Sequence, residues 1–186
     1  MGQHDAGGRL TYVLVDGENI DATLGNSILG RRPRPEERPR WDRVLEWAEQ
    51  AFEQEARGLF FLAVNDDLPM PFIQALTAIG FRPVPLRGEG KVVDTAIQRT
   101  AEAIAAREAD VALVSHDGDF LPQVRQLCDG TRHVALVGFG EFVNAGFRGL
   151  PGLRVVDMEH DVRAFNSPLP RIRIIGIDEF DPLEFL

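Results

Sequence analysis

The sequence predicts an α/β protein in which helices cover both faces of a mainly parallel sheet, forming a three-layer sandwich. Two observations lead to this prediction. Segments with the pattern of strands alternate along the chain with segments that have the spacing of helices. The strand segments, such as residues 111–114, are short and continuously apolar, as is typical of parallel strands buried on both faces. With 186 residues, of which 44% are hydrophobic, the chain fits one domain with a core of its own.

Six short apolar runs, each bounded by turn residues, are expected to form the strands. They span residues 11–15, 59–64, 81–86, 111–114, 133–137 and 154–156. Parallel strands need crossover connections, so the segments between these runs are expected to hold the helices.

The connection from the first strand to the second is expected to be long. Residues 20–28 predict a short helical turn over the core rather than an immediate helix. Residues 30–40 are rich in arginine and proline, a composition that predicts an exposed loop beside the site. An amphipathic helix is then expected over about 41–56, with Gly58 ending it.

The later helices are predicted from their capping and turn residues. Asn65-Asp66-Asp67 is expected to cap a helix that has prolines in its first turn and stops at Gly80. Asp94 is expected to open the next helix. A helix over about 121–128 and a glycine-broken helical piece near 141–147 complete the set.

Three parts of the chain are expected to differ in character. Residues 1–10 are predicted to be a flexible N-terminus, and residues 11–165 a single domain. Residues 166–186 are predicted to form a C-terminal strand, over Arg171 to Ile177, and a tail in which apolar side chains alternate with carboxylates. Because a disordered acidic tail needs no such apolar content, we expect this segment to pack against protein, including a second copy in a homo-oligomer.

Net charge argues against a general coat of positive charge for nucleic acid, because 29 acidic and 20 basic residues give a formal charge of -9. Any nucleic-acid contact must therefore be local. Six arginines fall within 13 positions, and arginine suits phosphate better than lysine does. They are Arg31, Arg32, Arg34, Arg38, Arg40 and Arg43. We select Arg31, Arg32 and Arg34 from this segment as candidate nucleic-acid-binding residues.

The expected setting is the cytoplasm, without a membrane. Cys128 is the only cysteine and can form no internal disulfide. No stretch approaches the 18 or more apolar residues of a membrane span, and residues 1–9 lack the apolar centre of a signal peptide.

Carboxylates gather where the strands are expected to end. Asp16 follows the first strand, Asp117 and Asp119 follow the strand 111–114, and Asp94 opens a helix. In open α/β sheets, ligands bind beyond the carboxyl ends of the strands. The sequence therefore predicts an acidic site made of these four aspartates.

Four converging carboxylates repel one another unless a cation lies among them, and hard divalent cations, magnesium in particular, take oxygen ligands. Such a cation could activate water for attack on a phosphodiester. Asn19 and Ser115 are candidate supporting residues, and Lys91 is a candidate phosphate contact. His116 is interpreted as a surface loop residue.

Simpler interpretations stay open for each carboxylate taken alone. Asp94 can be a carboxylate favoured by a helix N-terminus, Asp119 an N-cap, and Asp117-Gly118 a turn. These simpler interpretations are less convincing together, because three separate strand or helix ends would then have to carry carboxylates by coincidence.

Three motifs, in order and spacing, resemble the NYN domain, the LabA-like branch of the PIN-like nuclease superfamily. They are Val15-Asp16-Gly17-Glu18-Asn19-Ile20, Lys91-Val92-Val93-Asp94 and Leu113-Val114-Ser115-His116-Asp117-Gly118-Asp119-Phe120. The resemblance covers roughly Thr11 to Asp157.

The resemblance implies a PIN-like sheet in the order 3-2-1-4-5, which places the Asp16 strand beside the Asp117 strand. It also implies a ribonuclease dependent on magnesium or manganese, with Asp16, Asp94, Asp117 and Asp119 as its catalytic and metal-binding residues and RNA as its substrate.

Two alternatives to an enzyme of this kind remain. The first is a non-catalytic RNA-binding or assembly module of the same fold. The second is a phosphatase of the haloacid dehalogenase type with Asp16 as nucleophile. That pattern requires an aspartate two residues later, where this chain has Glu18.

Overall fold

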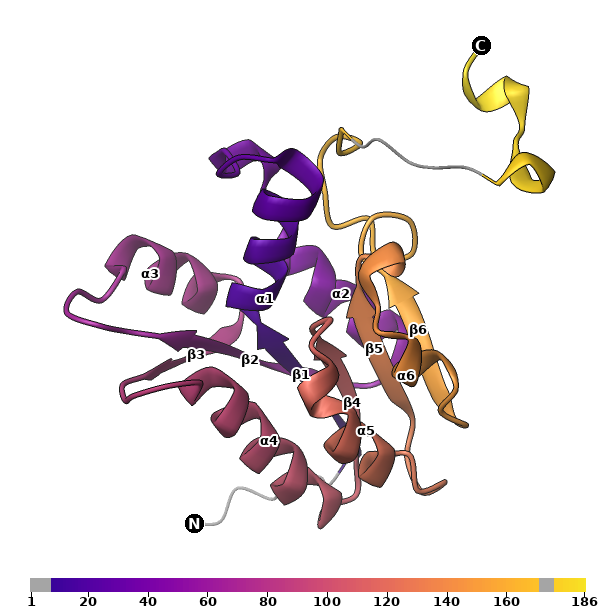
Figure 1. Cartoon of the computed structure of the whole chain (residues 1–186). Coiled ribbons are helices and arrows are strands. Elements are labelled where there is room, and N and C mark those ends of the chain that lie inside the picture. The colour runs from indigo at the N-terminus through magenta and orange to yellow at the C-terminus, as the bar shows by residue number, and fades with distance from the viewer. Residues whose placement is uncertain (1–7, 171–175) are drawn as a thin grey trace, which may run out of the picture.

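A six-stranded, fully parallel sheet lies at the centre of the computed structural model, which describes residues 8–170 and 176–186 (Figure 1). The strands are β1 (Leu10–Asp16), β2 (Ala56–Ala63), β3 (Phe81–Leu86), β4 (Ala109–Val114), β5 (Val134–Gly138) and β6 (Leu153–Asp157). Their order is β3-β2-β1-β4-β5-β6. The predicted order 3-2-1-4-5 is therefore confirmed, and β6 extends the sheet beside β5.

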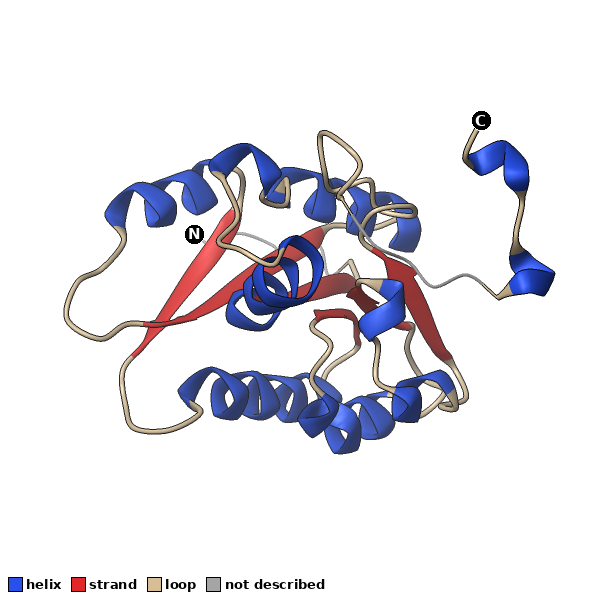
Figure 2. Ribbon diagram, turned by 45° about the horizontal axis from the view of Figure 1, so that its top comes forward, coloured by secondary structure: helices blue, strands red, loops and turns tan. Residues whose placement is uncertain are grey.

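Helices cover both faces of the sheet, as the predicted three-layer sandwich requires (Figure 2). Side chains of a strand alternate between faces, so Val13 and Val15 pack in one core and Leu14 packs in the other. The first core includes α2 (Trp41–Phe52) and α3 (Met70–Ala78). The second includes α4 (Val92–Ala105), α5 (Leu121–Leu127) and α6 (Ala145–Arg148). Among the described residues, no helix has the length and apolar character needed to cross a membrane.

The connection from β1 to β2 is long, but the prediction that it does not begin with a helix is wrong, because a helix starts directly after β1. Helix α1 (Gly17–Ala22) continues directly into a π-helical segment, Thr23–Leu29. The Asp16 side chain caps α1 by accepting a hydrogen bond from the backbone N–H of Asn19, and Ile20 and Leu24 are fully buried. A carboxylate assigned to metal binding thus also supplies the N-cap that starts a helix.

Helix α2 ends earlier than predicted, at Phe52, and Gly58 does not terminate it. The chain turns at Glu53, which has a left-handed backbone (φ 54°), and β2 begins at Ala56. Gly58 is buried inside β2, where a Cβ atom would lie 2.4 Å from a ring carbon of Phe81. This glycine is therefore required by packing against the neighbouring strand.

Helix α3 begins at Met70 with Pro69 at its N-cap position, so the predicted cap by Asn65-Asp66-Asp67 is wrong. Pro71 lies in its first turn, where proline costs no hydrogen bond. Gly80, with φ 105°, follows the helix as expected and leads into β3.

The two ends of the chain are described only in part. Near the N-terminus, Arg9 makes an ion pair of 2.8 Å with Asp110. The predicted strand over 171–177 lies mostly outside the described residues, and Ile177 begins a 3₁₀ turn, Ile177–Glu179. The tail leads away from the sheet in Figure 1, and its rings Phe180 and Phe185 stack on each other at 5.6 Å.

Candidate active site

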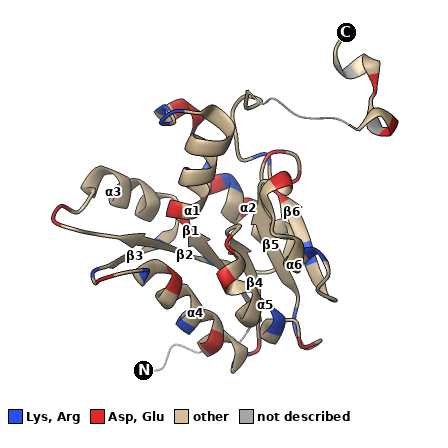
Figure 3. Cartoon of the chain, viewed as in Figure 1, with Lys and Arg blue, Asp and Glu red and all other residues tan. Residues whose placement is uncertain are grey.

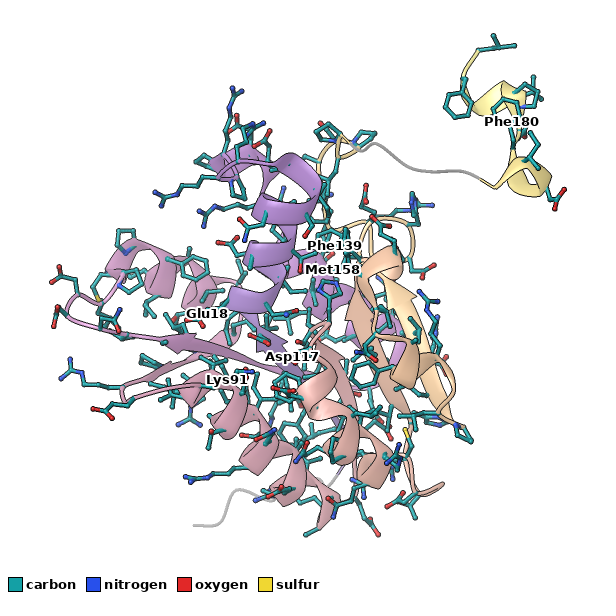
Figure 4. The ribbon with its side chains drawn as sticks, viewed as in Figure 1. Glu18, Lys91, Asp117, Phe139, Met158 and Phe180 are labelled. Atoms are coloured by element: carbon teal, nitrogen blue, oxygen red, sulfur yellow. The ribbon has the colours of Figure 1, made fainter. Side chains whose placement is uncertain are left out.

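An acidic crevice of about 330 Å³ lies where the carboxyl ends of β1 and β4 meet the first turn of α4. Strands β1 and β4 pair directly, with Val15 opposite Val114, so the residues that follow them are neighbours. Figure 4 shows Glu18, Lys91 and Asp117 together in this region. The charged and amide side chains that line the crevice are those of Asp16, Glu18, Asn19, Lys91, Asp94 and Asp117.

Three of the four predicted aspartates converge. Carboxylate oxygens of Asp94, Asp117 and Asp119 all lie within 4.8 Å of one another. Asp94 is held by the first turn of α4, and Asp117 precedes a 3₁₀ turn whose backbone N–H at Asp119 donates to it at 2.9 Å. The arrangement brings three negative charges from two separate segments to one point.

Asp16, the fourth predicted aspartate, lies in the same crevice but is buried, with 2% of its surface exposed. Its Oδ2 accepts a hydrogen bond from the Ser115 hydroxyl at 3.0 Å. The pKa of Asp16 is raised to about 6, mainly by burial and also by the charges of Asp94 and Asp117, while the hydrogen bonds from Ser115 and Asn19 act to lower it. The Ser115 hydroxyl therefore fixes the orientation of the Asp16 carboxylate.

A second buried carboxylate, that of Asp110, has surroundings that differ from those of Asp16. Asp110 lies at the opposite end of β4 and receives hydrogen bonds from Arg9, Gln54 and the backbone N–H of His133. Burial alone would raise the pKa of Asp110, but these donors hold it below its usual value. Asp110 is thus neutralised within the fold, whereas Asp16 faces other carboxylates.

Lys91 is the one cation that lines the crevice among the described residues. Its Nζ lies 2.7 Å from Asp119 Oδ2 and 3.4 Å from Asp94 Oδ2. Burial and the charge of Asp117 nonetheless raise the pKa of Asp94, with Lys91 acting in the opposite direction. One ammonium group therefore offsets only part of the negative charge.

The donor set fits a hard divalent cation. Asp94, Asp117 and Asp119 offer only oxygen atoms, which Mg²⁺ and Mn²⁺ prefer, and the crevice has room for water and phosphate oxygens beside them. Repulsion among the three carboxylates would fall when a cation binds.

Asn19 supports the site through the backbone of the loop after β4. Its Oδ1 accepts a hydrogen bond from the backbone N–H of His116 at 2.7 Å and lies 3.1 Å from His116 Nδ1. The side chain therefore joins α1 to the loop that carries Asp117 and Asp119.

The interpretation of His116 as a surface residue is wrong, because only 7% of it is exposed. Its Nε2 accepts from the backbone N–H of Phe139 at 2.6 Å, so the proton of the neutral ring is on Nδ1, which faces Asn19. Burial lowers the pKa of His116 to about 4. A Cβ at Gly138 would lie 2.6 Å from this ring, so the absence of a side chain there makes room for it.

Arg31, Arg32 and Arg34 are exposed as predicted, but they follow the far end of the first helical segment from Asp16. Residues Gly17 to Leu29 separate them from Asp16, a helical length of up to about 20 Å. Arg31 makes two hydrogen bonds to Glu37, of 2.6 and 2.8 Å, whereas Arg32 and Arg34 are exposed. Figure 3 shows basic and acidic residues side by side in the segment that follows this first helical segment. The position does not suit contact with the scissile phosphate itself.

Sequence reasoning missed one charged residue of the crevice, Glu18. It lines the crevice, and its Oε1 accepts a hydrogen bond from the backbone N–H of Ala63 at 3.3 Å. Its place two residues after Asp16, directly beyond a strand, was the available signal. The same residue borders an apolar pocket on its other side.

Comparisons with known proteins agree with this description. The family model of the NYN domain matches residues 10–148. A crystal structure of a protein of unknown function from Vibrio parahaemolyticus has a TM-score of 0.64 to this chain, with 21% sequence identity over 82% of this chain and 94% of that one. At this identity the likeness shows the fold alone. No curated protein matches the chain.

Proposed function

The chain belongs to the NYN domain family, and from that premise we propose that it is a metal-dependent endoribonuclease that hydrolyses phosphodiester bonds at the acidic crevice. The family model supports a PIN-like nuclease fold, for which RNA is the expected substrate. The observation that carries the proposal is the convergence of three carboxylates within 4.8 Å at the carboxyl end of the sheet.

Asp94, Asp117 and Asp119 would hold Mg²⁺ or Mn²⁺, and Asp16 completes the acidic set. A bound cation of this kind would supply Lewis-acid activation of the phosphodiester and of the attacking water. Asp16 suits a proton acceptor, because the Ser115 hydroxyl fixes its orientation in the crevice and, in the metal-free protein, its pKa of about 6 makes it more basic than an ordinary aspartate. Lys91, once a cation replaces it among the carboxylates, is placed to meet a substrate phosphate.

The direct test is cleavage of mixed RNA and DNA substrates in magnesium, manganese or chelator. Endonucleolytic RNA fragments in either metal, and none in chelator, are expected. Uncleaved but bound RNA would favour the non-catalytic module. Release of phosphate from a monoester without cleavage of RNA would instead indicate a phosphatase.

Removal of a ligand should weaken metal binding. Titration calorimetry with Mn²⁺ is expected to show a site whose affinity falls at least about tenfold in Asp117→Asn, since loss of even an indirect partner of a metal site costs that much. Asp67→Asn, an exposed aspartate before α3, is the matched control and should bind as the wild type does. Equal affinity in the wild type and in an Asp16→Asn, Asp117→Asn double variant would contradict the metal assignment.

The arginine segment is proposed to contact phosphates several nucleotides from the cleaved bond. Each neutralised phosphate on a single strand contributes a slope of about -0.7 to the dependence of log affinity on log salt. Replacing Arg31, Arg32 and Arg34 with serine should therefore weaken RNA binding and flatten that slope, as measured by fluorescence anisotropy. Arg31→Ser alone should change it least, because Glu37 already pairs with Arg31. An unchanged slope in the triple variant would leave the segment a solvated loop.

The tail is proposed to make a homo-oligomer. Ile177, Leu183 and Leu186 are 83%, 76% and 100% exposed in the single chain, so their apolar surface is available to a second copy. Truncation after Pro170 should then reduce the mass measured by light scattering from that of an oligomer to that of a monomer. A full-length chain that is already monomeric at high concentration would refute this proposal.

A further inference from the structure

A second pocket, of about 290 Å³, lies directly beside the acidic crevice. Glu18 and Ala63 line both hollows, so the two are separated by a single side chain and one strand end. The pocket differs from the crevice in character, because its wall is mostly aromatic and aliphatic. Neither the family match nor the acidic chemistry accounts for it.

Three aromatic rings give this pocket its shape. Trp41 begins α2, Phe60 lies on β2, and Phe72 lies on α3. The Trp41 and Phe72 rings stand almost perpendicular to Phe60, with centroid distances of 5.1 and 5.4 Å and an interplanar angle of 82° in both pairs. Phe60 is 3% exposed and forms the buried part of the pocket, while the other two rings are only partly buried.

The start of α1 is adapted to this arrangement. A Cβ atom at Gly17 would lie 2.5 Å from Cε1 of Phe60, so a side chain there would displace the ring. Gly17 therefore allows the helix that carries Glu18 to lie directly against the pocket.

Polar groups occur at the rim. Arg38 and Asp21 face each other at 4.0 Å, and both side chains are more than a third exposed. An ion pair with this separation and this exposure contributes little to stability, and its members can exchange partners. The guanidinium of Arg38 can reach a phosphate group, while the Asp21 carboxylate can accept from an exocyclic amino group of a base.

We propose that this pocket binds a nucleobase of the RNA strand whose backbone occupies the crevice. The proposal rests on the proposed ribonuclease function, since it is the strand in the crevice that brings a base to the pocket. Flat apolar walls bind the face of any base by stacking, and a positive rim group suits the adjoining phosphate. A strand bound in both places would be held in register relative to the acidic cluster.

Tryptophan fluorescence tests the proposal without cleavage. The chain has two tryptophans, and Trp47 packs on Phe52 and does not line the pocket, so Trp47→Phe leaves Trp41 as the only reporter. This variant would be titrated in EDTA with a single-stranded RNA 12-mer and with an abasic 12-mer of the same backbone charge. Saturable quenching by the RNA is expected, with affinity about tenfold above that for the abasic strand, the usual size of one stacked base.

Phe72→Leu supplies the second measurement, because it keeps apolar volume but removes an aromatic face. It should weaken binding of the RNA several-fold and leave binding of the abasic strand unchanged. Equal affinity of the Trp47→Phe protein for both strands, or no change in Trp41 emission, would overturn the proposal. The proposal would also be overturned if Trp41 emission changed with protein concentration and this change disappeared on truncation after Pro170. The pocket would then bind the tail of a second copy of the chain.

Cleavage assays separate this proposal from the one on which it rests. If RNA is cleaved in metal but the two strands bind equally, the base pocket is wrong and the nuclease assignment stands. If the base-bearing strand binds more tightly but is never cleaved, the pocket is supported as part of a binding module and the nuclease assignment fails.

Discussion

Asp94→Asn is expected to reduce RNA cleavage by about a hundredfold or more while leaving the fold intact. The carboxylate belongs to the three-aspartate cluster, and loss of one electrostatic group from an active site has an effect of this size. Burial and Asp117 raise the pKa of Asp94, so its charge is disfavoured in the folded state. An amide of the same shape removes that repulsion, and the variant should unfold at the same temperature as the wild type or higher.

The measurement is single-turnover cleavage in Mn²⁺ together with thermal unfolding. Glu102→Gln is the matched control, since Glu102 is an exposed carboxylate on the same helix, α4, away from the crevice. Wild-type cleavage by Asp94→Asn would remove Asp94 from the catalytic set. A clearly lower unfolding temperature would show instead that Asp94 mainly stabilises the N-terminus of α4.

The parallel sheet could be predicted from the sequence because each strand is a continuous apolar run. Residues 111–114 are buried on both faces, and this requirement is visible in the residues themselves. The ends of the helices were harder to predict from the sequence, because they depend on contacts with residues of other elements. Gly58 is a helix terminator by local rules, yet it is a glycine because the Phe81 ring of β3 fills the space above it.

The candidate site also has parts that could be predicted from the sequence and parts that could not. The neighbourhood of Asp16 and Asp117 could be predicted, because parallel strands end at one edge of the sheet and these carboxylates lie at the ends of the paired strands β1 and β4. The role of His116 could not be predicted, because its partner Phe139 follows β5, and nothing in the local sequence places that backbone N–H against the ring. The aromatic pocket likewise depends on how the consecutive elements α2, β2 and α3 pack on one another, and the local sequence does not show this packing.

Between pH 7 and pH 4, the contributions of Asp16 and His116 to the stability of the metal-free protein are expected to be opposite in sign and nearly equal in size. Asp16 has a folded pKa of about 6 against an ordinary value of 3.8, so the folded state binds more protons and gains stability as pH falls through this range. His116 has a folded pKa of about 4 against 6.5, so the unfolded state binds more protons and stability is lost. Each shift of a little over two units corresponds to about 3 kcal/mol.

Single substitutions should separate the two effects. Asp16→Asn removes the gain on acidification, so this variant should lose about 3 kcal/mol relative to the wild type between pH 7 and pH 4. His116→Gln removes the destabilisation that His116 causes on acidification. The stability of this variant should therefore rise relative to the wild type between pH 7 and pH 4, whatever its stability at pH 7. The slopes of the two variants are thus expected to differ from the wild-type slope in opposite directions.

Urea unfolding at several pH values in EDTA measures these slopes. The reading depends on the difference in slope between each variant and the wild type, because the other carboxylates contribute equally to both. Asp110→Asn is a useful comparison, since the pKa of that carboxyl is lowered and its loss should act in the opposite direction to the loss of Asp16. A wild-type slope in Asp16→Asn would mean that this carboxyl is not destabilised by burial beside Asp94 and Asp117, and the basis for assigning it a proton-accepting role would be lost.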